Sequence, residues 1–409
     1  MFAISNKMQD HTRTHAVHQG PSFQHATPAF RTFCGPDALA SLSGQLERLG
    51  VKRPVVFCSP SIQRHHGQEL ARVEAALGDR PAARFDGVET HSPLPAIEAA
   101  GRFLADAKAD AVIAVGGGSA IVTARAASIV HAEARDVREL CTRREADGTL
   151  TSPRLLAPKL PQWIAPTTPT TAYAKAGCAI RDPATGERLA LFDPKTRAQG
   201  IFVDPALALT APVALTRGAA LNALCMAVGG LQSTVDDPLA EAVLTHALRT
   251  LAEWLPRLSS APDEAEPRVR LMLGALLSGQ GSDYFGGGLA QALAHAAGPL
   301  SSTSNGVVEA ILLPHTMRFN APVIPGRLAN IAEILGASPS SGDSPEDAAI
   351  AGTEQLLRRA RVPGRLRDVG IDRNSLSEIS AHTLDDWTLT TAPRRAGRDD
   401  LEELLHAAW

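Results

Sequence analysis

The feature that most constrains the fold is residues 111–120, AVIAVGGGSA. The first five residues are small or β-branched and apolar, which is typical of a strand that helices cover on both faces. Gly116, Gly117 and Gly118 follow, and Ser119 is expected to cap a helix that the next apolar residues predict. Because backbone N–H groups point outward at such a helix N-terminus, the turn suits a phosphate group. A plain tight turn between strand and helix is the alternative interpretation.

Around this stretch, predicted strands and helices alternate. A short edge strand over 29–33 and a helix over 37–49 come first. They are followed by a strand over 54–58, a helix over 68–77, a strand over 83–85 and a helix over 91–108. After a polar insertion at 139–162, strands are predicted at 161–165, at 189–192 and at 200–203, the last two closing the sheet as a paired ribbon and a final strand. This spacing predicts a doubly wound, mostly parallel sheet.

From residue 206 onward the pattern is helical. Helices are predicted over 216–232, 238–258, 267–279, 289–297, 306–320, 325–335, 346–361, 375–380 and 398–408. We therefore predict an α/β nucleotide-binding domain over 27–205 and an all-helical domain over 206–409, with the active site in the cleft between them. Residues 1–26 are polar and carry four histidines without periodicity. They predict a disordered leader, a metal-binding leader being the alternative.

Charge and composition exclude several classes of partner. The net charge is -3 and charged residues make up 20% of the chain without a basic run, which argues against nucleic acid or an anionic membrane as partner. No apolar stretch is seen that approaches the roughly 18 residues of a membrane span, and no signal peptide is recognised. The five cysteines are not closely paired, so neither disulfides nor a cysteine zinc site is expected. These features predict a soluble, cytoplasmic protein.

A threonine-rich turn follows the strand predicted at 161–165. Thr167 and Thr168 come directly after Pro166, and Thr171 lies three residues further on. Threonine hydroxyls and free N–H groups at the carboxyl end of a strand suit a ribose or a diphosphate. The turn is therefore a second candidate element of a nucleotide site.

Taken together, several motifs resemble a known family. The Gly-Gly-Gly-Ser turn, the Pro-Thr-Thr turn, Asp204-Pro205 and the stretch LLPHTMRFNAP at 312–322 occur in the order seen in the iron-containing alcohol dehydrogenases. The resemblance runs from about residue 28 to the C-terminus and is closest to the maleylacetate reductase branch. It implies a nucleotide-binding α/β domain followed by a helical domain, hydride transfer between a nicotinamide cofactor and a carbonyl compound, a divalent metal in the cleft, and a homodimer.

The metal ligands implied by the resemblance are substituted. The family places an aspartate or asparagine and a histidine four residues apart on one helix, and two more histidines fourteen residues apart. Here these positions hold Asn222, Met226, Gln291 and Asn305. Three neutral amides and a thioether do not hold iron(II) or zinc tightly. We therefore predict that no metal is bound and that the four residues line the substrate pocket.

The cofactor motifs are changed less. Ser59 stands where many family members have an aspartate that binds the adenosine ribose, and the loss of that carboxylate permits NADPH as well as NADH. Arg125 stands at the position of a family lysine, either beside the diphosphate or substrate or as a surface residue. The resemblance implies that NADH or NADPH is held by Ser59, Gly116, Gly117, Gly118, Ser119, Thr167, Thr168 and Thr171.

Three residues are candidates for catalysis. His295 keeps its family position one helical turn after Gln291, where an imidazole can donate a proton to a carbonyl oxygen as hydride arrives. A histidine hydrogen-bonded within the helical core is the alternative. Tyr173 and Tyr284 are the only tyrosines, and both lie in segments predicted near the cleft, as catalytic or as packing residues.

Three functions remain open at this point. The first is a metal-independent NAD(P)H-dependent reductase of a small oxo or enone substrate, with or without a carboxylate, in which His295 donates the proton. The second is a non-redox dehydratase, isomerase or cyclase that keeps the scaffold and uses His295 as acid or base. The third is a catalytically silent binding subunit.

Overall fold

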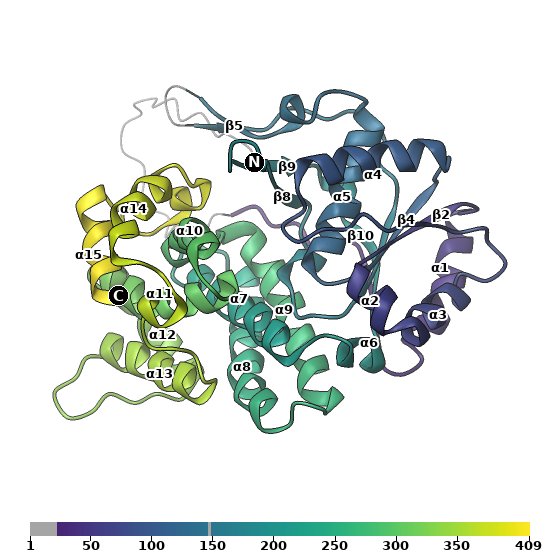
Figure 1. The fold of residues 1–409 in the computed structure, drawn as a ribbon. Coiled ribbons are helices and arrows are strands. Elements are labelled where there is room, and N and C mark those ends of the chain that lie inside the picture. The colour runs from purple at the N-terminus through teal and green to yellow at the C-terminus, as the bar shows by residue number, and fades with distance from the viewer. Residues whose placement is uncertain (1–22, 146–148) are drawn as a thin grey trace, which may run out of the picture.

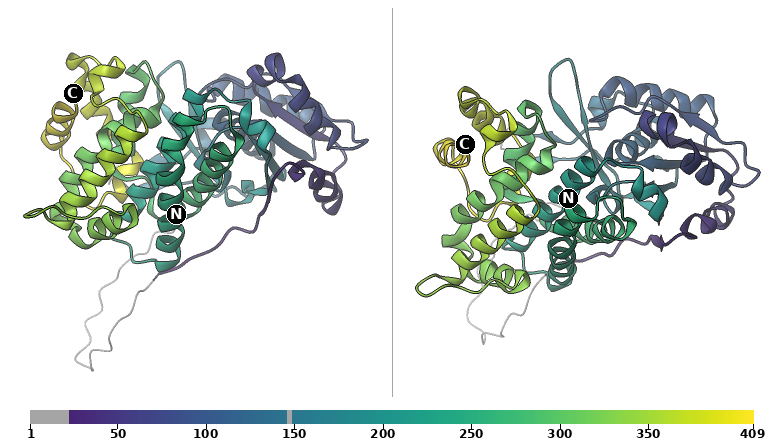
Figure 2. Two further views of the ribbon diagram at one scale, coloured as in Figure 1. Left: turned by 90° about the horizontal axis from the view of Figure 1, so that it is seen from below. Right: turned by 60° about the horizontal axis from the view of Figure 1, so that its bottom comes forward.

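The computed structural model describes residues 23–145 and 149–409. The chain forms two halves side by side, an α/β half and a helical half (Figure 1). Seen from below, an extended segment at the start of the described chain runs along the helical half to the edge of the sheet (Figure 2). The predicted leader over 1–26 lies mostly outside the described residues. Within this segment, His25 Nδ1 lies 2.8 Å from Asp237 Oδ2, so it is tied to the helical half.

The α/β half is built on one six-stranded sheet in which every pair of neighbours is parallel, in the order β1-β10-β7-β4-β2-β3. The central strand β4 pairs with β2 and β7 and is buried along its whole length, as its apolar run predicts. The strands are β1 (Arg31–Cys34), β2 (Pro54–Cys58), β3 (Ala83–Phe85), β4 (Ala111–Gly116), β7 (Gln162–Pro166) and β10 (Ala198–Val203). The predicted fold class is confirmed.

Helices cover both faces of this sheet. On one face lie α1 (Leu42–Arg48) and α3 (Gly67–Ala75), and on the other lie α4 (Leu94–Asp106) and α5 (Gly118–Glu133). The short helices α2 (Pro60–His65) and α6 (Pro205–Leu209) follow β2 and β10. After β2 the chain continues to β3 at one edge of the sheet, whereas after β4 it continues to β7 on the other side. The carboxyl ends of β2 and β4 therefore flank a crevice. Open α/β sheets bind ligands at such a point.

Two short ribbons lie outside the main sheet. One pairs β5 (Arg143–Arg144) with β6 (Leu150–Thr151), and the other pairs β8 (Gly177–Arg181) with β9 (Arg188–Phe192). The expectation that residues 189–192 close the sheet is therefore wrong, because they pair with β8 in a separate antiparallel ribbon. The final strand β10 does join the sheet, but it inserts between β1 and β7.

The helical half packs around one apolar core. Its helices are α7 (Val213–Leu231), α8 (Pro238–Ser260), α9 (Ala265–Phe285), α10 (Gly288–Ala297), α11 (Asn305–Asn320), α12 (Pro325–Leu335), α13 (Pro345–Arg359), α14 (Leu376–Leu384) and α15 (Arg398–Ala408). By length and composition α7 could cross a membrane, contrary to the expectation that no stretch approaches a span. It is mostly buried and packs against α8, α9, α10 and α11, as the core helix of a globular domain does.

Candidate functional site

The glycine turn lies at the carboxyl edge of the sheet. Gly116 ends β4 with a φ of +142°, which side chains rarely tolerate. Gly117 is the N-cap of α5 and the helix begins at Gly118. The expectation that Ser119 caps the helix is wrong, because Ser119 already lies in its first turn and no side-chain cap is formed. The first N–H groups of α5 nevertheless point out of the sheet edge, where they suit an anion.

The other predicted cofactor residues gather at this turn. A Cβ on Gly117 would lie 3.0 Å from Thr168 Oγ1, and one on Gly116 would lie 3.6 Å from Ser59 Oγ. Thr167 donates its N–H to Gly116 O at 3.0 Å. The carboxyl ends of β2, β4 and β7 thus bring these predicted residues to one place, while their role in cofactor binding stays a prediction.

A strained loop borders the same helix. His91 and Ser92 have φ of 64° and 48°, which is uncommon for two consecutive residues that are not glycine. The Ser92 hydroxyl is buried and donates to Ser119 O at 3.3 Å, while Thr123 Oγ1 lies 3.1 Å from Ser92 Oγ. These bonds hold the loop against the first turn of α5, and strain of this kind often occurs at functional sites.

Tyr173 takes a different place from the one expected. It ends the short helix η3 (Thr171–Tyr173), is completely buried and donates its hydroxyl to Thr168 O. Burial raises the pKa of its hydroxyl. A phenol that is shielded and engaged in this way holds the Thr168 turn in position rather than exchanging protons with a substrate.

Side chains clamp the segment that follows, residues 172–177. Arg125, completely buried, donates to Ala172 O at 2.8 Å and to Gly177 O at 2.9 Å, so it is neither a surface residue nor a phosphate ligand. Two further carbonyl groups are held by Arg197, which donates to Ala174 O and also pairs with Asp283 of α9, and by Thr196, which donates to Ala176 O at 3.1 Å. Four backbone carbonyls in a run of six residues are therefore fixed from the side.

Lys175 lies in the middle of this clamped segment. Its two neighbours in the chain are fully buried, whereas Lys175 itself is half-buried and makes no hydrogen bond or ion pair with any described residue. Burial, above all, lowers the pKa of Lys175. The carboxyl groups that act on it are those of Asp283 and Glu309, both from the helical half. The ammonium therefore lies where the two halves meet.

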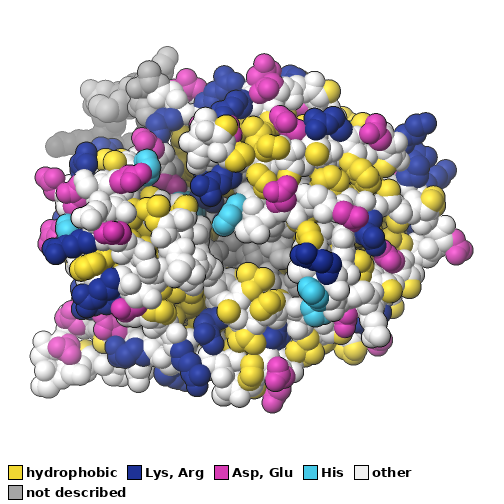
Figure 3. All heavy atoms as spheres, viewed as in Figure 1, with side chains coloured by type: hydrophobic (Ala, Val, Ile, Leu, Met, Phe, Trp, Pro, Cys, Tyr) yellow, Lys and Arg dark blue, Asp and Glu magenta, His cyan; other side chains and the backbone are white. Residues whose placement is uncertain are grey.

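The surface is hollowed between the two halves, and Lys, Arg and His side chains lie around the hollow (Figure 3). The helical wall of this cleft comes from three helices. Each presents two residues four positions apart, which share one face of a helix. The pairs are Asn222 and Met226 on α7, Gln291 and His295 on α10, and Asn305 and Glu309 on α11.

The helices that carry the four substituted positions pack against one another, and two of the four side chains meet. A Cβ on Gly287 would overlap both Gln291 Oε1 and Met226 Sδ, so these two atoms meet at one glycine. A Cβ on Gly306 would overlap the backbone of α7 at Gly218, which lets α11 and α7 approach closely at Asn222. The described residues hold no group of three or more histidine, cysteine, aspartate or glutamate side chains suited to a metal. Amide and thioether donors with a single carboxyl do not fit iron or zinc.

Glu309 is the carboxyl group of this wall. It is 1% exposed, and Asn222 Nδ2 donates to its Oε2 at 2.6 Å. Its other oxygen, Oε1, is buried and has no hydrogen-bond partner among the described residues. Burial raises the pKa of Glu309 to about 8, although Asn222, Lys175 and Arg188 act in the opposite direction. At neutral pH this carboxyl group therefore holds its proton.

His295 is paired with a carboxylate from the C-terminal region. Its Nδ1 lies 2.7 Å from Asp386 Oδ2, while Asp386 Oδ1 accepts from the Thr388 N–H at 2.8 Å. Burial and the positive charges of Arg188 and Lys175 outweigh the Asp386 carboxylate and lower the pKa of His295 to about 4. The neutral ring then donates from Nδ1 to Asp386, which leaves Nε2 as an acceptor.

Arg188 reaches this pair from the ribbon of the α/β half. Its guanidinium lies over the Trp387 ring, 5.0 Å from the centroid, and the Trp387 ring is 6.0 Å from that of His295. Arg188 is an exposed residue, but its guanidinium loses part of its hydration here, which lowers its pKa, while Asp386 and Glu309 act to raise it. Arg188 thus adds a second positive charge opposite the helical wall.

The structure gives less information on the two remaining predicted site residues, Thr171 and Tyr284. Thr171 is buried at the contact between the halves, and a Cβ on Gly279 of α9 would overlap its backbone carbonyl. Tyr284 lies near the C-terminal end of α9, and its side chain is outside the described part of the chain. Their functional assignments stay predictions.

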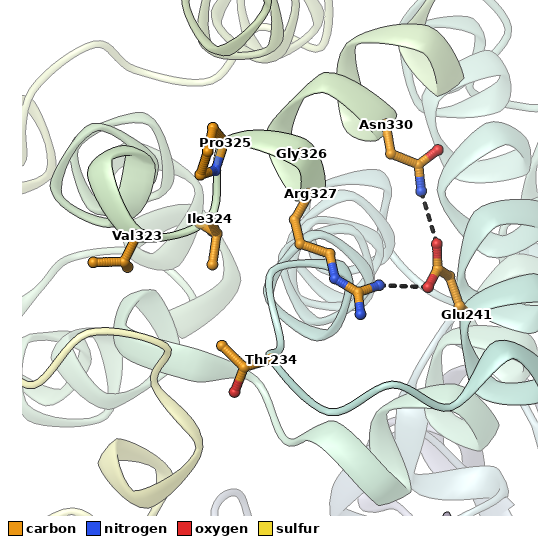
Figure 4. A pocket seen from close by; sticks show the side chains of 8 residues that line it. All are labelled: Thr234, Glu241, Val323, Ile324, Pro325, Gly326, Arg327 and Asn330. Carbon is orange, nitrogen blue, oxygen red and sulfur yellow. Dashed lines mark hydrogen bonds and ion pairs between the residues drawn. The ribbon is translucent and has the colours of Figure 1, made fainter. Parts of the chain in front are cut away.

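A separate hollow of about 630 Å³ lies on the helical half, between η6 (Ala321–Val323), α12 and α8. Its one carboxylate, Glu241, is bound by both Arg327 and Asn330 (Figure 4). Because these polar groups satisfy one another, the hollow lacks the unpartnered groups of the cleft.

The sequence analysis missed four charged residues of the cleft: Lys175, Arg188, Glu309 and Asp386. Only Glu309 had a local signal, since it follows Asn305 by the same four positions that separate Gln291 from His295. Asp386 is 91 residues from His295, so no motif spacing joins them.

Two family models cover most of the chain. The model described as iron-containing alcohol dehydrogenase matches residues 28–205, and that of the C-terminal part of the same family matches residues 216–409. The chain is 29% identical to maleylacetate reductase 1 of Cupriavidus pinatubonensis, over 93% of this chain and 95% of that protein. It is 28% identical to the lactaldehyde reductase of Escherichia coli strain K12, over 92% of this chain and 97% of the relative.

Solved structures share the fold. The alcohol dehydrogenase from Oenococcus oeni superposes with a TM-score of 0.86 at 23% sequence identity, covering 95% of this chain and all of that one. At this identity the likeness concerns the fold alone.

Proposed function

Because the chain belongs to the iron-containing alcohol dehydrogenase family, we propose that it is a metal-independent, NAD(P)H-dependent reductase of a small carbonyl substrate. The enzyme is an oxidoreductase, and its relatives are named as reductases and dehydrogenases. One observation carries the proposal: the sheet edge has a glycine turn with free helix N–H groups, while the helical half presents amide, thioether and carboxyl groups whose chemistry does not fit a metal.

The residues at the sheet edge fit the cofactor. Three consecutive glycines leave room beside the N-terminus of α5, and Ser59 and Thr168 border that space. The N–H groups of α5 would bind the diphosphate, and these hydroxyls would bind ribose or phosphate oxygens. When bound there, NADH or NADPH supplies a hydride to the carbonyl carbon. The residues of the cleft have to orient the carbonyl group and deliver a proton to its oxygen.

His295 does not suit the donor role that the sequence suggests. A ring with a pKa of about 4 holds no proton beyond the one on Nδ1 near neutral pH, and that proton is directed at Asp386. Its free Nε2 can accept a hydrogen bond from a substrate hydroxyl group. We therefore propose His295 as an acceptor that orients the substrate, and place the proton donor elsewhere in the cleft.

The first test is cofactor binding. Purified protein is titrated with NADH and NADPH while cofactor fluorescence is followed, and we expect saturable binding of at least one of them. Turnover is then measured with NADH or NADPH and two probes taken from the names of relatives, lactaldehyde and maleylacetate. The absence of any fluorescence change at cofactor concentrations on the order of millimolar would overturn the proposal.

A further inference from the structure

Lys175 is held in place more firmly than a surface lysine needs to be. The four backbone contacts from Arg125, Arg197 and Thr196 fix the chain on both sides of it. One of the guanidinium groups, that of Arg125, is fully buried, and burying such a group is costly. Meanwhile the Lys175 ammonium has no described partner of its own. A rigid backbone that presents an unpaired cation to a cleft is the arrangement expected of a preorganised binding group.

Glu309, on the helical wall, also has a polar atom without a described partner. Asn222 fixes one carboxyl oxygen, and the second is fully buried with no hydrogen-bond partner. A buried oxygen without a partner is unfavourable by about 1–3 kcal/mol, and a bound water or a polar group of a ligand can satisfy it. Lys175 and Glu309 influence each other electrostatically, yet they form no ion pair within 4.0 Å. The two groups are therefore close enough to interact, yet no direct contact joins them.

We propose that Lys175 and Glu309 bind the carbonyl oxygen of the substrate between them and replace the metal ion in polarising it. This inference rests on the reductase function proposed above. Lys175 attracts the negative charge that develops on the oxygen, and Glu309 donates the proton. Neither residue belongs to the glycine turn, the threonine turn or the four substituted metal positions.

As a hydride reaches the carbonyl carbon, the carbon–oxygen π bond breaks and its electron pair moves to the oxygen. That oxygen takes the proton of Glu309, whose O–H bond breaks. The products are the alcohol, the oxidised nicotinamide and the Glu309 carboxylate, which Asn222 and the Lys175 ammonium stabilise. A proton from solvent then restores Glu309.

Two variants test the pair. Lys175→Met removes the cation, and we expect kcat to fall by about 10²–10³, the loss typical when one preorganised donor to an oxyanion is removed. Glu309→Gln keeps the shape and the Asn222 contact but cannot give up a proton, and we expect kcat to fall by about 10²–10⁴. NADH affinity should stay within about threefold of wild type in both, since neither residue borders the glycine turn.

Matched controls separate this role from a general loss of charge. Lys195→Met removes a lysine of the same domain whose Nζ binds Leu155 O and Asp193, and Glu241→Gln removes a carboxylate in the separate hollow. Both should keep wild-type kcat. In Lys175→Ala, added ethylamine should restore part of the lost rate, which a purely structural role of Lys175 would not allow.

A spectroscopic readout works without turnover. With oxidised NAD and carbonyl-labelled lactaldehyde, the infrared C=O stretching band should move to lower frequency in wild type and stay unshifted in Lys175→Met. If NADH fails to bind wild type, the reductase function itself is wrong. If NADH binds but both variants retain wild-type kcat, or the band does not move in wild type, the reductase survives and the assignment of Lys175 and Glu309 is overturned.

Discussion

The two walls of the cleft differ in the kind of chemical group that they present. The sheet wall offers backbone N–H groups of a glycine turn that is continuous in sequence, at the end of β4. The helical wall offers side chains from α7, α10, α11 and the segment at Asp386, opposed by Lys175 and Arg188. A backbone site depends on conformation and tolerates many changes of side chain, whereas a side-chain site depends on the identity of each residue. The two walls should therefore respond to mutation in different ways.

The largest effect should come from rebuilding the metal site on the helical wall. The variant Asn222→Asp, Met226→His, Gln291→His, Asn305→His restores a carboxylate and three imidazoles on faces that already converge. We expect near-stoichiometric zinc in this variant and none retained by wild type, a change in zinc affinity of more than about 10⁴. Metal analysis of protein purified without chelators measures it. Stoichiometric zinc or iron in wild type would contradict the proposal that the protein works without a metal.

A smaller but specific effect is expected on the sheet wall. Gly116→Val places a β-branched residue at a φ of +142°, with a Cβ 3.1 Å from that of Ala120. Because strain of this kind is unfavourable by about 1–3 kcal/mol, we expect NADH affinity to fall about tenfold to a hundredfold as the turn shifts. Fluorescence titration measures it. Gly326→Ala, at a helical glycine with open space around it, is the control and should bind as wild type does.

The same contrast explains what could be predicted from the sequence. The strands at 54–58 and 83–85 and the helices at 325–335 and 398–408 were predicted to the residue, because proline, glycine or a change of periodicity marks their ends. The helix predicted over 267–279 continues to Phe285. Gly279 is not the end of this helix. Its missing side chain lets the helix approach the backbone of Thr171 closely. Local signals therefore located the elements and the turn.

The helical wall was predicted less completely for a physical reason. Asn222, Gln291 and Asn305 were located through family spacing, and the helices that carry them pack against one another. Lys175 and Asp386 carry no such signal, because their relevance comes from segments that only the folded chain places together. Burial also reverses the protonation that residue type suggests, with a neutral His295 and a protonated Glu309. A sequence gives residue types, while these states depend on the surroundings.

The last predicted effect concerns stability and pH rather than binding. The pKa of Glu309 is about 8 in the folded protein, against an ordinary value of 4.5, so between these pH values the folded state holds one proton more than the unfolded state. The groups facing it are Lys175, Arg188 and Cys225, and burial keeps the Cys225 thiol neutral by raising its pKa well above 9.0. The contribution of Glu309 to the free energy of unfolding is therefore present below pH 4.5 and decreases as pH rises, by about 1.4 kcal/mol per unit.

Glu309→Gln isolates this contribution. Glutamine does not titrate, so the stability of the variant relative to wild type should increase as pH rises from about 5 to 8 and level off above that. Guanidinium unfolding of both proteins at a series of pH values measures the difference, in which the other titrating groups cancel. A difference that stays constant from pH 5 to 8 would mean that Glu309 is already ionised in the folded protein. In that case the helical wall would hold a carboxylate and no proton to give, and its chemistry would depend on Lys175 alone.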